Sequence, residues 1–190
     1  HFFWGDERYV PPDDPRSNCR MAKEAWLDRI AVPPENVHPM PTNFLDPDEA
    51  ARRYETTLRR HFPAPWPRFD LILLGMGADG HTASLFPRSP ALEERERWVV
   101  SVRAPVEPSV RLTLTLPVIN QAAAVWFLVS GEDKAEALRK VLTDEAAVEA
   151  PPAARVRPVQ GALIWWVDSP AAALLLEPRR PAERRGGEAG

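Results

Sequence analysis

The spacing of apolar residues switches repeatedly between the helical and the strand period, so the chain is predicted to alternate helices with strands. The first helical stretch covers residues 18–30, and Ser17 precedes it as a candidate N-cap. Pro33 and Pro34 end this stretch. The apolar stripe of the expected helix consists of Cys19, Ala22, Trp26 and Ile30.

A second helical stretch begins with three start signals. Asp46 is a candidate N-cap, Pro47 suits the first helical position, and Glu49 stands where a capping box places its acid. The apolar stripe that follows consists of Ala51, Tyr54, Leu58 and Phe62. Because the start signals and the stripe agree, a helix is predicted here.

Short apolar runs predict the strands. Residues 69–74 form a nearly continuous apolar run that ends at Gly75, which is typical of a strand buried on both faces of a parallel sheet. Residues 1–4 form another apolar, strand-like run. Strands that alternate with helices indicate a layered α/β fold. The other expected strands are residues 99–102, 111–116, 125–129 and 163–167, and the other expected helices are residues 132–142 and 170–176.

The composition fits one folded domain. With 190 residues, of which 44% are hydrophobic and 27% charged, the chain is long enough for a hydrophobic core and has the composition of an average globular protein. We expect a single α/β domain over residues 1–176. Residues 177–190 lack an apolar face and predict a flexible tail. Arginines alternate with glutamates in this tail, which favours a solvated terminus over an arm that binds nucleic acid.

Charge, cysteine content and the lengths of the apolar runs narrow the function classes. A net charge of -3 gives no general attraction for nucleic acid or for an anionic membrane, so neither is expected as a partner. A single cysteine, Cys19, cannot form an internal disulfide, which favours a reducing cytoplasm. No CxxC or HExxH pattern is present and the histidines are scattered along the chain, so no metal site is predicted. The longest apolar runs, residues 71–74 and 122–129, are far shorter than the ~20 residues that span a bilayer.

Ligands of α/β sheets bind beyond the carboxyl ends of the strands, so residues that follow an apolar run are candidates for chemistry. Residues 69–74 lead into a glycine-rich loop, in which the backbone amides at Gly77 and Gly80 can approach a ligand and after which a helix can begin. His81 could then take a proton from water, and Asp79 could fix its tautomer or orient the nucleophile. An ordinary glycine turn with a surface Asp and His explains the same spacing equally well.

Three cations stand at other strand ends. Arg8 follows the first apolar run and Asp6, and it could clamp an anion; the alternative is an ion pair within the loop. Lys134 stands where a glycine leads from a strand into a helix, which resembles a simple phosphate site. Arg111 begins another strand. For Lys134 and Arg111 the alternative interpretation is a solvated surface charge.

Together these segments resemble the glucosamine-6-phosphate isomerase/6-phosphogluconolactonase family. The resemblance covers nearly the whole chain, to about residue 176, with the motifs in the family's order, and the GADGHTASLFP stretch is highly specific. The motifs are GDERYVP at residues 5–11, DLILLGMGADGHTASLFP at 70–87, RLTLTLP at 111–117, GEDK at 131–134 and GALIWWVD at 161–168.

The resemblance implies a Rossmann-like fold, with helices on both faces of a layered sheet, and a reaction that uses neither metal nor organic cofactor. The implied reaction is hydrolysis of 6-phosphogluconolactone to 6-phosphogluconate in the oxidative pentose phosphate pathway, with this small sugar phosphate as the partner. His81 would be the general base and Asp79 would support it. Asp6 and Arg8 would line the sugar site, and Arg111 and Lys134 would hold the 6-phosphate. The implied substrate-binding set is Asp6, Arg8, Gly77, Gly80, Arg111 and Lys134.

The start of the chain departs from the family pattern. Members normally begin with a further α/β unit whose glycine–serine loop contributes to the phosphate site, and this chain starts after it. We therefore expect a fragment of a longer product that lacks its N-terminal βα unit, because residues 1–4 would otherwise expose a hydrophobic strand. The sequence does not indicate the oligomeric state.

Two alternative functions stay open. A sugar-phosphate deaminase or isomerase of the same fold would place a further acid shortly after the histidine, and residues 82–86 contain none. A sugar-phosphate-binding domain without activity would fit the missing loop. The presence of both Asp79 and His81 argues against that interpretation.

Overall fold

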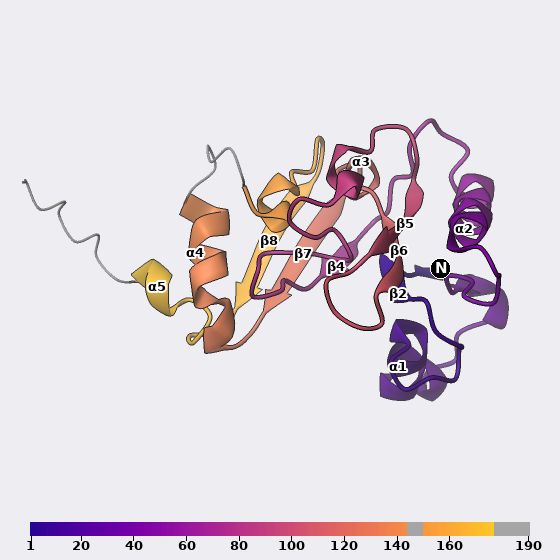
Figure 1. The fold of residues 1–190 in the computed structure, drawn as a ribbon, viewed down its shortest axis with the longest axis horizontal. Helices are drawn as coiled ribbons and strands as arrows, with labels where there is room; N and C mark the ends of the chain where they lie inside the picture. The colour runs from indigo at the N-terminus through magenta and orange to yellow at the C-terminus, as the bar shows by residue number, and fades with distance from the viewer. Residues whose placement is uncertain (144–149, 177–190) are drawn as a thin grey trace, which may run out of the picture.

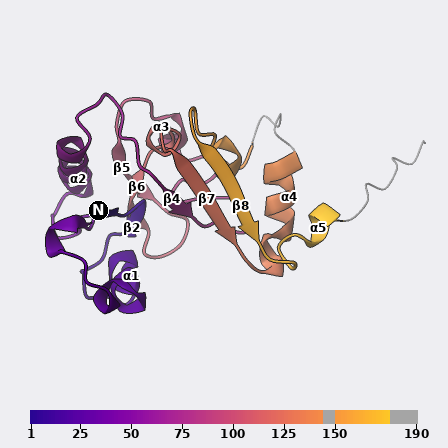
Figure 2. The ribbon, with the colours of Figure 1, turned by 180° about the vertical axis from the view of Figure 1, so that it is seen from behind.

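The structure is a computed structural model that describes residues 1–143 and 150–176 (Figure 1). The predicted tail, residues 177–190, lies outside the described residues. Helices α1 and α2 lie at one end of the molecule, α4 and α5 lie at the other, and the strands lie between them, as the view from behind also shows (Figure 2). The helices are α1 (Asn18–Ala25), α2 (Pro47–His61), α3 (Leu116–Ile119), α4 (Ala135–Thr143) and α5 (Ala173–Leu176).

The described strands form two sheets of three strands and one strand pair. One sheet is parallel, with the order β4–β7–β8, and the other is antiparallel, with the order β2–β6–β5. Strand β1 pairs with β3 in parallel. The fold is therefore α/β as predicted, and the antiparallel sheet is a feature that the sequence did not indicate. The strands are β1 (Phe2–Phe3), β2 (Asp6–Arg8), β3 (Val37–His38), β4 (Ile72–Leu74), β5 (Val99–Arg103), β6 (Val110–Leu114), β7 (Ala124–Val129) and β8 (Ala162–Val167).

Helix α2 begins where the sequence predicted. The side chain of Asp46 accepts a hydrogen bond from the backbone N–H of Asp48 at 2.9 Å, and Pro47 occupies the first helical position. The predicted apolar stripe faces the core. The capping box does not form, because the carboxylate of Glu49 binds the guanidinium groups of Arg52 and Arg53 instead.

Helix α1 ends earlier than its apolar pattern predicted. Ser17 caps it as expected, accepting a hydrogen bond from the backbone N–H of Arg20 at 3.1 Å. The chain then tightens into a 3₁₀ turn, which rotates Leu27 into the core. Trp26 and Ile30, which were predicted on the buried stripe, are consequently exposed.

Strand β4 is shorter and more exposed than its apolar run suggested. Ile72 and Leu74 are buried, whereas Leu73 is 60% exposed, so the prediction of a strand buried on both faces was wrong. Neighbouring side chains of a strand point to opposite faces, and the described chain packs its core against only the face that holds Ile72 and Leu74. On that face, the rings of Phe127 in β7 and Trp165 in β8 stack with their centroids 3.9 Å apart.

The core joins the ends of the molecule and fixes the strands that carry the candidate site. Strand β6 contributes Leu112 and Leu114, and α4 contributes Leu138. The buried carboxylate of Glu55 in α2 accepts a hydrogen bond from the backbone N–H of Trp98 at 3.1 Å, just before β5. Among the described residues, no helix is long and apolar enough to cross a membrane.

Candidate active site

Strand β2, strand β6 and the loop after β4 meet at the candidate site. Asp6 in β2 stands opposite Thr113 in β6. Ser84, at the end of the loop, binds both: its hydroxyl donates to Asp6 Oδ2 at 2.7 Å, and its backbone N–H donates to Thr113 Oγ1 at 3.3 Å. The predicted motifs at residues 5–11 and 70–87 are therefore held together through the side chain of Ser84.

The glycine loop is closed by its own backbone. The N–H of Gly77 donates to the carbonyl of His81 at 2.9 Å, and the N–H of Gly80 donates to the carbonyl of Gly77 at 2.9 Å. Gly80 has a φ of 77°, in the left-handed region that favours glycine. Turns follow the loop, not the helix that we expected, with a single bridge between Thr82 and Leu85. The two predicted amides thus shape the loop in this conformation.

His81 and Asp79 form a close pair. Asp79 Oδ1 lies 2.5 Å from His81 Nδ1 and accepts a hydrogen bond from the backbone N–H of His81 at 3.0 Å. Partial burial raises the pKa of the Asp79 carboxyl, but the bonds from the His81 backbone and ring outweigh it, and the net shift of this pKa is downward. A carboxylate at Nδ1 places the proton there, so Nε2 carries the free electron pair.

Gly77 makes room for the imidazole. A Cβ atom at residue 77 would lie 2.1 Å from His81 Nδ1 and 2.7 Å from Asp79 Oδ1. The imidazole ring also contacts Phe86, with the ring centroids 4.6 Å apart. The absence of a side chain at residue 77 is therefore what allows the ring to reach its carboxylate.

A hollow opens beside this pair. Its volume is about 1000 Å³, in the range of small-molecule sites, and its lining includes Asp79, Phe86, Arg88 and Arg103. The His81 side chain remains 32% exposed, so water can reach its ring. The two arginines were not identified from the sequence, because they lie outside the motifs and nothing in their local pattern distinguishes them from surface charges.

Arg8 and Arg111 stand opposite each other on β2 and β6. The Arg111 side chain is buried and donates through Nε to the carbonyl of Pro108 at 2.7 Å. Burial, and then the positive charge of Arg8, lowers the pKa of Arg111. Arg8 donates to the carbonyl of Arg16 at 2.9 Å, while its buried Nε has no hydrogen-bond partner in the described chain. Two adjacent guanidinium groups with spare donors favour an anion between them.

The alternative for Arg8, an ion pair with a neighbouring acid, does not form among the described residues. Glu7 is buried, and its carboxylate instead accepts hydrogen bonds at the N-terminus of α1, from the backbone N–H groups of Asn18 and Cys19, both at 2.7 Å. This caps the helix and stabilises its dipole. The same contact holds the side chain of Asn18 against Asp6. The Asn18 side-chain amide donates to Asp6 Oδ1 at 3.3 Å.

Asp6 interacts electrostatically with both arginines. Burial raises the pKa of its carboxyl, and the Ser84 hydroxyl, Arg8 and Arg111 only partly offset this effect. A partly buried carboxyl next to bound sugar hydroxyls can accept or donate a hydrogen bond. Asn18 and Ser84, which hold this carboxyl, lie within or beside the sequence motifs but were not identified as site residues from the sequence.

Lys134 lies at the carboxyl end of β7. Because β4 and β7 are parallel, this end shares an edge of the sheet with the glycine loop. Its ammonium group contacts Asp133 at 2.7 Å, and within the described residues no contact joins it to Arg111. The backbone N–H of Gly131, part of the expected phosphate site, is bonded to the carboxylate of Asp168 at 3.1 Å.

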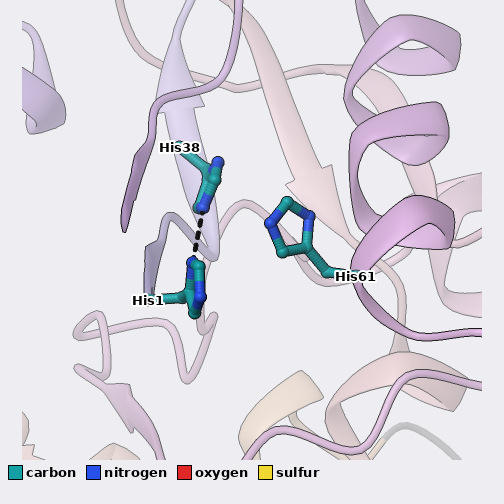
Figure 3. A group of neighbouring side chains, drawn as sticks. All are labelled: His1, His38 and His61. Carbon is teal, nitrogen blue, oxygen red and sulfur yellow. Dashed lines mark hydrogen bonds between the residues drawn. The ribbon is translucent and has the colours of Figure 1, made fainter. Parts of the chain in front are cut away.

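Three of the four histidines lie together, although the sequence analysis treated them as scattered. They are His1 just before β1, His38 at the end of β3 and His61 at the end of α2 (Figure 3). Parallel pairing of β1 with β3 and the packing of α2 bring together residues far apart in the chain. Spacing along the chain could not reveal this group, since its three members belong to no common motif.

Comparisons with known proteins indicate one family. A family model described as glucosamine-6-phosphate isomerases/6-phosphogluconolactonase matches residues 1–165. The 6-phosphogluconolactonase of Synechocystis sp. is 49% identical over 174 residues, which are 90% of this chain and 71% of that protein. The 6-phosphogluconolactonase of Mycobacterium tuberculosis is 43% identical, over 92% of this chain and 73% of that protein.

Solved structures share the fold. The 6-phosphogluconolactonase of Trypanosoma brucei superposes with a TM-score of 0.82 at 34% identity, over 92% of this chain and 73% of that chain. A monomeric glucosamine-6-phosphate deaminase superposes with a TM-score of 0.74 at 25% identity, over 90% of this chain and 73% of that chain. From motif order, family match and fold, the chain belongs to the glucosamine-6-phosphate isomerase/6-phosphogluconolactonase family.

Proposed function

We propose that this chain hydrolyses 6-phosphogluconolactone to 6-phosphogluconate, the lactone-opening step of the oxidative pentose phosphate pathway. The relatives named as 6-phosphogluconolactonases support this activity. The observation that carries the mechanism is the His81–Asp79 pair, in which the carboxylate lies at His81 Nδ1 and water can reach the ring, so that Nε2 would serve as the base.

The pair suits base catalysis of water attack. His81 Nε2 takes a proton from water while the water oxygen bonds to the lactone carbonyl carbon. The carbonyl oxygen becomes an oxyanion, which a nearby cation stabilises. When the carbonyl re-forms, the bond from carbon to the ring oxygen breaks, and the imidazolium returns its proton to that oxygen. The products are the acid and a free hydroxyl, and Asp79 holds the ring and stabilises its charged form throughout.

The cations suit an anionic substrate. Arg8 lies beside the carboxyl of Asp6, and the two residues would line the sugar. Arg111 and Lys134 would hold the phosphate, with Arg111 supported by the neighbouring Arg8. The loop at Gly77 and Gly80 would face the substrate from the other side. The chain overall is slightly acidic, so the attraction for a phosphate has to come from these local charges.

His81→Asn tests the mechanism, because asparagine keeps hydrogen-bonding capacity without useful basicity. Turnover of the lactone should fall roughly 10²- to 10⁴-fold, while competition by 6-phosphogluconate should stay within a few-fold. The uncatalysed hydrolysis of the lactone must be subtracted. Unchanged turnover would exclude His81 as the base. Release of ammonia from glucosamine 6-phosphate, assayed in parallel, would favour the deaminase activity of the other family branch.

The surroundings of the enzyme are also a proposal. We place it in the reducing cytoplasm, in line with a single free cysteine, Cys19, which is buried. A plant relative from Arabidopsis thaliana has chloroplastic in its name, so compartments differ within the family. Cell fractionation followed by lactonase assay would separate the two cases. The proposed partner is the sugar phosphate alone, without nucleic acid or membrane.

A further inference from the structure

The three clustered histidines form a compact group of ring nitrogens. One ring nitrogen from each of His1, His38 and His61 lies within 4.8 Å of the other two. His1 precedes β1, His38 ends β3, and His61 ends α2, so each comes from a different element. Figure 3 shows the His1 and His38 rings joined by a hydrogen bond, with the His61 ring beside them.

Their spacing is close to that of ligands on one metal ion. His1 Nδ1 and His38 Nε2 are 3.0 Å apart. Two nitrogens that bind zinc at 2.0–2.1 Å with tetrahedral angles lie about 3.3 Å apart. The His61 ring lies next to both, with centroid distances of 4.3 Å to His38 and 5.1 Å to His1. Rotation of the two exposed side chains, His1 and His61, would bring the three nitrogens to this separation.

The orientation of His61 is a second, independent observation. Its Nδ1 lies 3.0 Å from the carbonyl oxygen of Thr57, one turn earlier in α2. A carbonyl can only accept, so Nδ1 carries the proton and Nε2 holds the free electron pair. Histidine ligands in metal sites are commonly oriented in this way, by a hydrogen bond from the other ring nitrogen.

The side chains of His1 and His61 are exposed, and that of His38 is half-buried. Solvent reaches the group through a hollow of about 640 Å³, which His1 and His61 help to line. An ion can therefore enter without rearrangement of the backbone.

We propose that His1, His38 and His61 bind one divalent transition-metal ion, with zinc as the best fit. Three imidazoles suit zinc in tetrahedral coordination, and water would complete it. Of the three ligands, His1 lies five residues before Asp6, which is about 16 Å along an extended chain. The metal would thus cross-link β1, β3 and α2 and stabilise the fold, without taking part in lactone hydrolysis.

Metal binding by the purified chain tests this proposal. The protein is stripped with a chelator and dialysed at neutral pH against Zn²⁺, and the bound zinc is measured by elemental analysis. The matched variants are His61→Ala and His81→Asn, which each remove one histidine. We expect one ion per chain, an affinity at least about tenfold weaker in His61→Ala, and an unchanged affinity in His81→Asn.

Two further measurements guard against misfolding and loose surface binding. Far-UV circular dichroism should be the same for all three proteins, and His61→Gln serves as a second variant if His61→Ala is unfolded. Zn²⁺ should raise the melting temperature of the parent chain but not of the His61 variants. Absence of stoichiometric binding, equal affinity in the His61 variants, or loss of binding in His81→Asn would each overturn the assignment.

Discussion

Gly77→Ala should disable the enzyme through His81, although residue 77 has no side chain of its own in the reaction. The new Cβ would lie 2.1 Å from His81 Nδ1 and 2.2 Å from Cε1. Carbon and ring atoms in contact need roughly 3.4 Å, so the imidazole has to retreat by about 1.3 Å or turn away. Either movement breaks the 2.5 Å contact between Nδ1 and Asp79 Oδ1.

The size of the effect follows from this displacement. A misplacement of about 1 Å at a reacting group costs on the order of 10²-fold in rate, and a general base contributes roughly 10²- to 10⁴-fold. We therefore expect kcat to fall about 10²-fold or more. KM should change only a few-fold, because the cations that attract the substrate lie on other elements.

Gly75→Ala is the matched control in the same loop. A Cβ at residue 75 would meet no atom within 4 Å, and the backbone there needs no left-handed conformation. This variant should retain parental activity. Both variants are assayed for lactone hydrolysis by continuous titration of the released acid, and melting temperatures confirm that they are folded.

A double-mutant cycle with His81→Asn identifies the route of the effect. If Gly77 acts only by leaving room for the imidazole, Gly77→Ala should cause no further loss in a His81→Asn background. Additive losses would show that residue 77 acts elsewhere, for instance on the loop backbone. Equal activity of Gly77→Ala and Gly75→Ala would refute the steric argument altogether.

Three other perturbations test the rest of the site. Lys134→Ala and Arg111→Ala should each cost about 1.5–3 kcal/mol in kcat/KM on the phosphorylated lactone and almost nothing on unphosphorylated gluconolactone; equal losses on both would indicate a structural role. Exhaustive chelation should leave the lactonase rate unchanged at a temperature where the stripped chain is folded, and a rate lost with EDTA and regained with zinc under those conditions would contradict the metal-free mechanism. Asp6→Asn should lower activity yet raise the melting temperature at neutral pH. Burial raises the pKa of Asp6, so the stability that depends on its protonated form is present in acid and is lost as the pH rises through the folded-state pKa. The increase in melting temperature caused by Asp6→Asn should therefore shrink toward pH 4. An unchanged melting temperature at neutral pH would count against a raised pKa of Asp6.

The long periodic segments were predictable because their local signals agree with their packing. Helix α2 has a cap, a first-turn proline and an apolar stripe, and the core accepts that stripe. Helix α1 shows the limit of the same reasoning. Its stripe continues to Ile30, but a 3₁₀ turn rotates Leu27 into the core, and periodicity alone cannot reveal a change of helical pitch.

The candidate site was predictable only in part, because its geometry depends on pairing between distant strands. Asp79 and His81 are only two residues apart in the sequence, and their side chains form a hydrogen-bonded pair. The placement of Arg8 against Arg111 requires the register of β2 with β6, which lie more than a hundred residues apart in the sequence. Nothing in either segment states that they pair antiparallel.

The role of Glu7 illustrates why residue types alone left alternatives open. An acid beside Arg8 suggested an ion pair, yet Glu7 is turned inward to cap α1. Strand alternation explains the difference: Asp6 and Arg8 share one face of β2, and Glu7 points to the other. On that shared face the Asp6 carboxylate accepts a hydrogen bond from Ser84, and among the described residues no ion pair joins a carboxylate to Arg8 or Arg111. A substrate phosphate or a developing oxyanion is then the charge that best completes this face of the sheet.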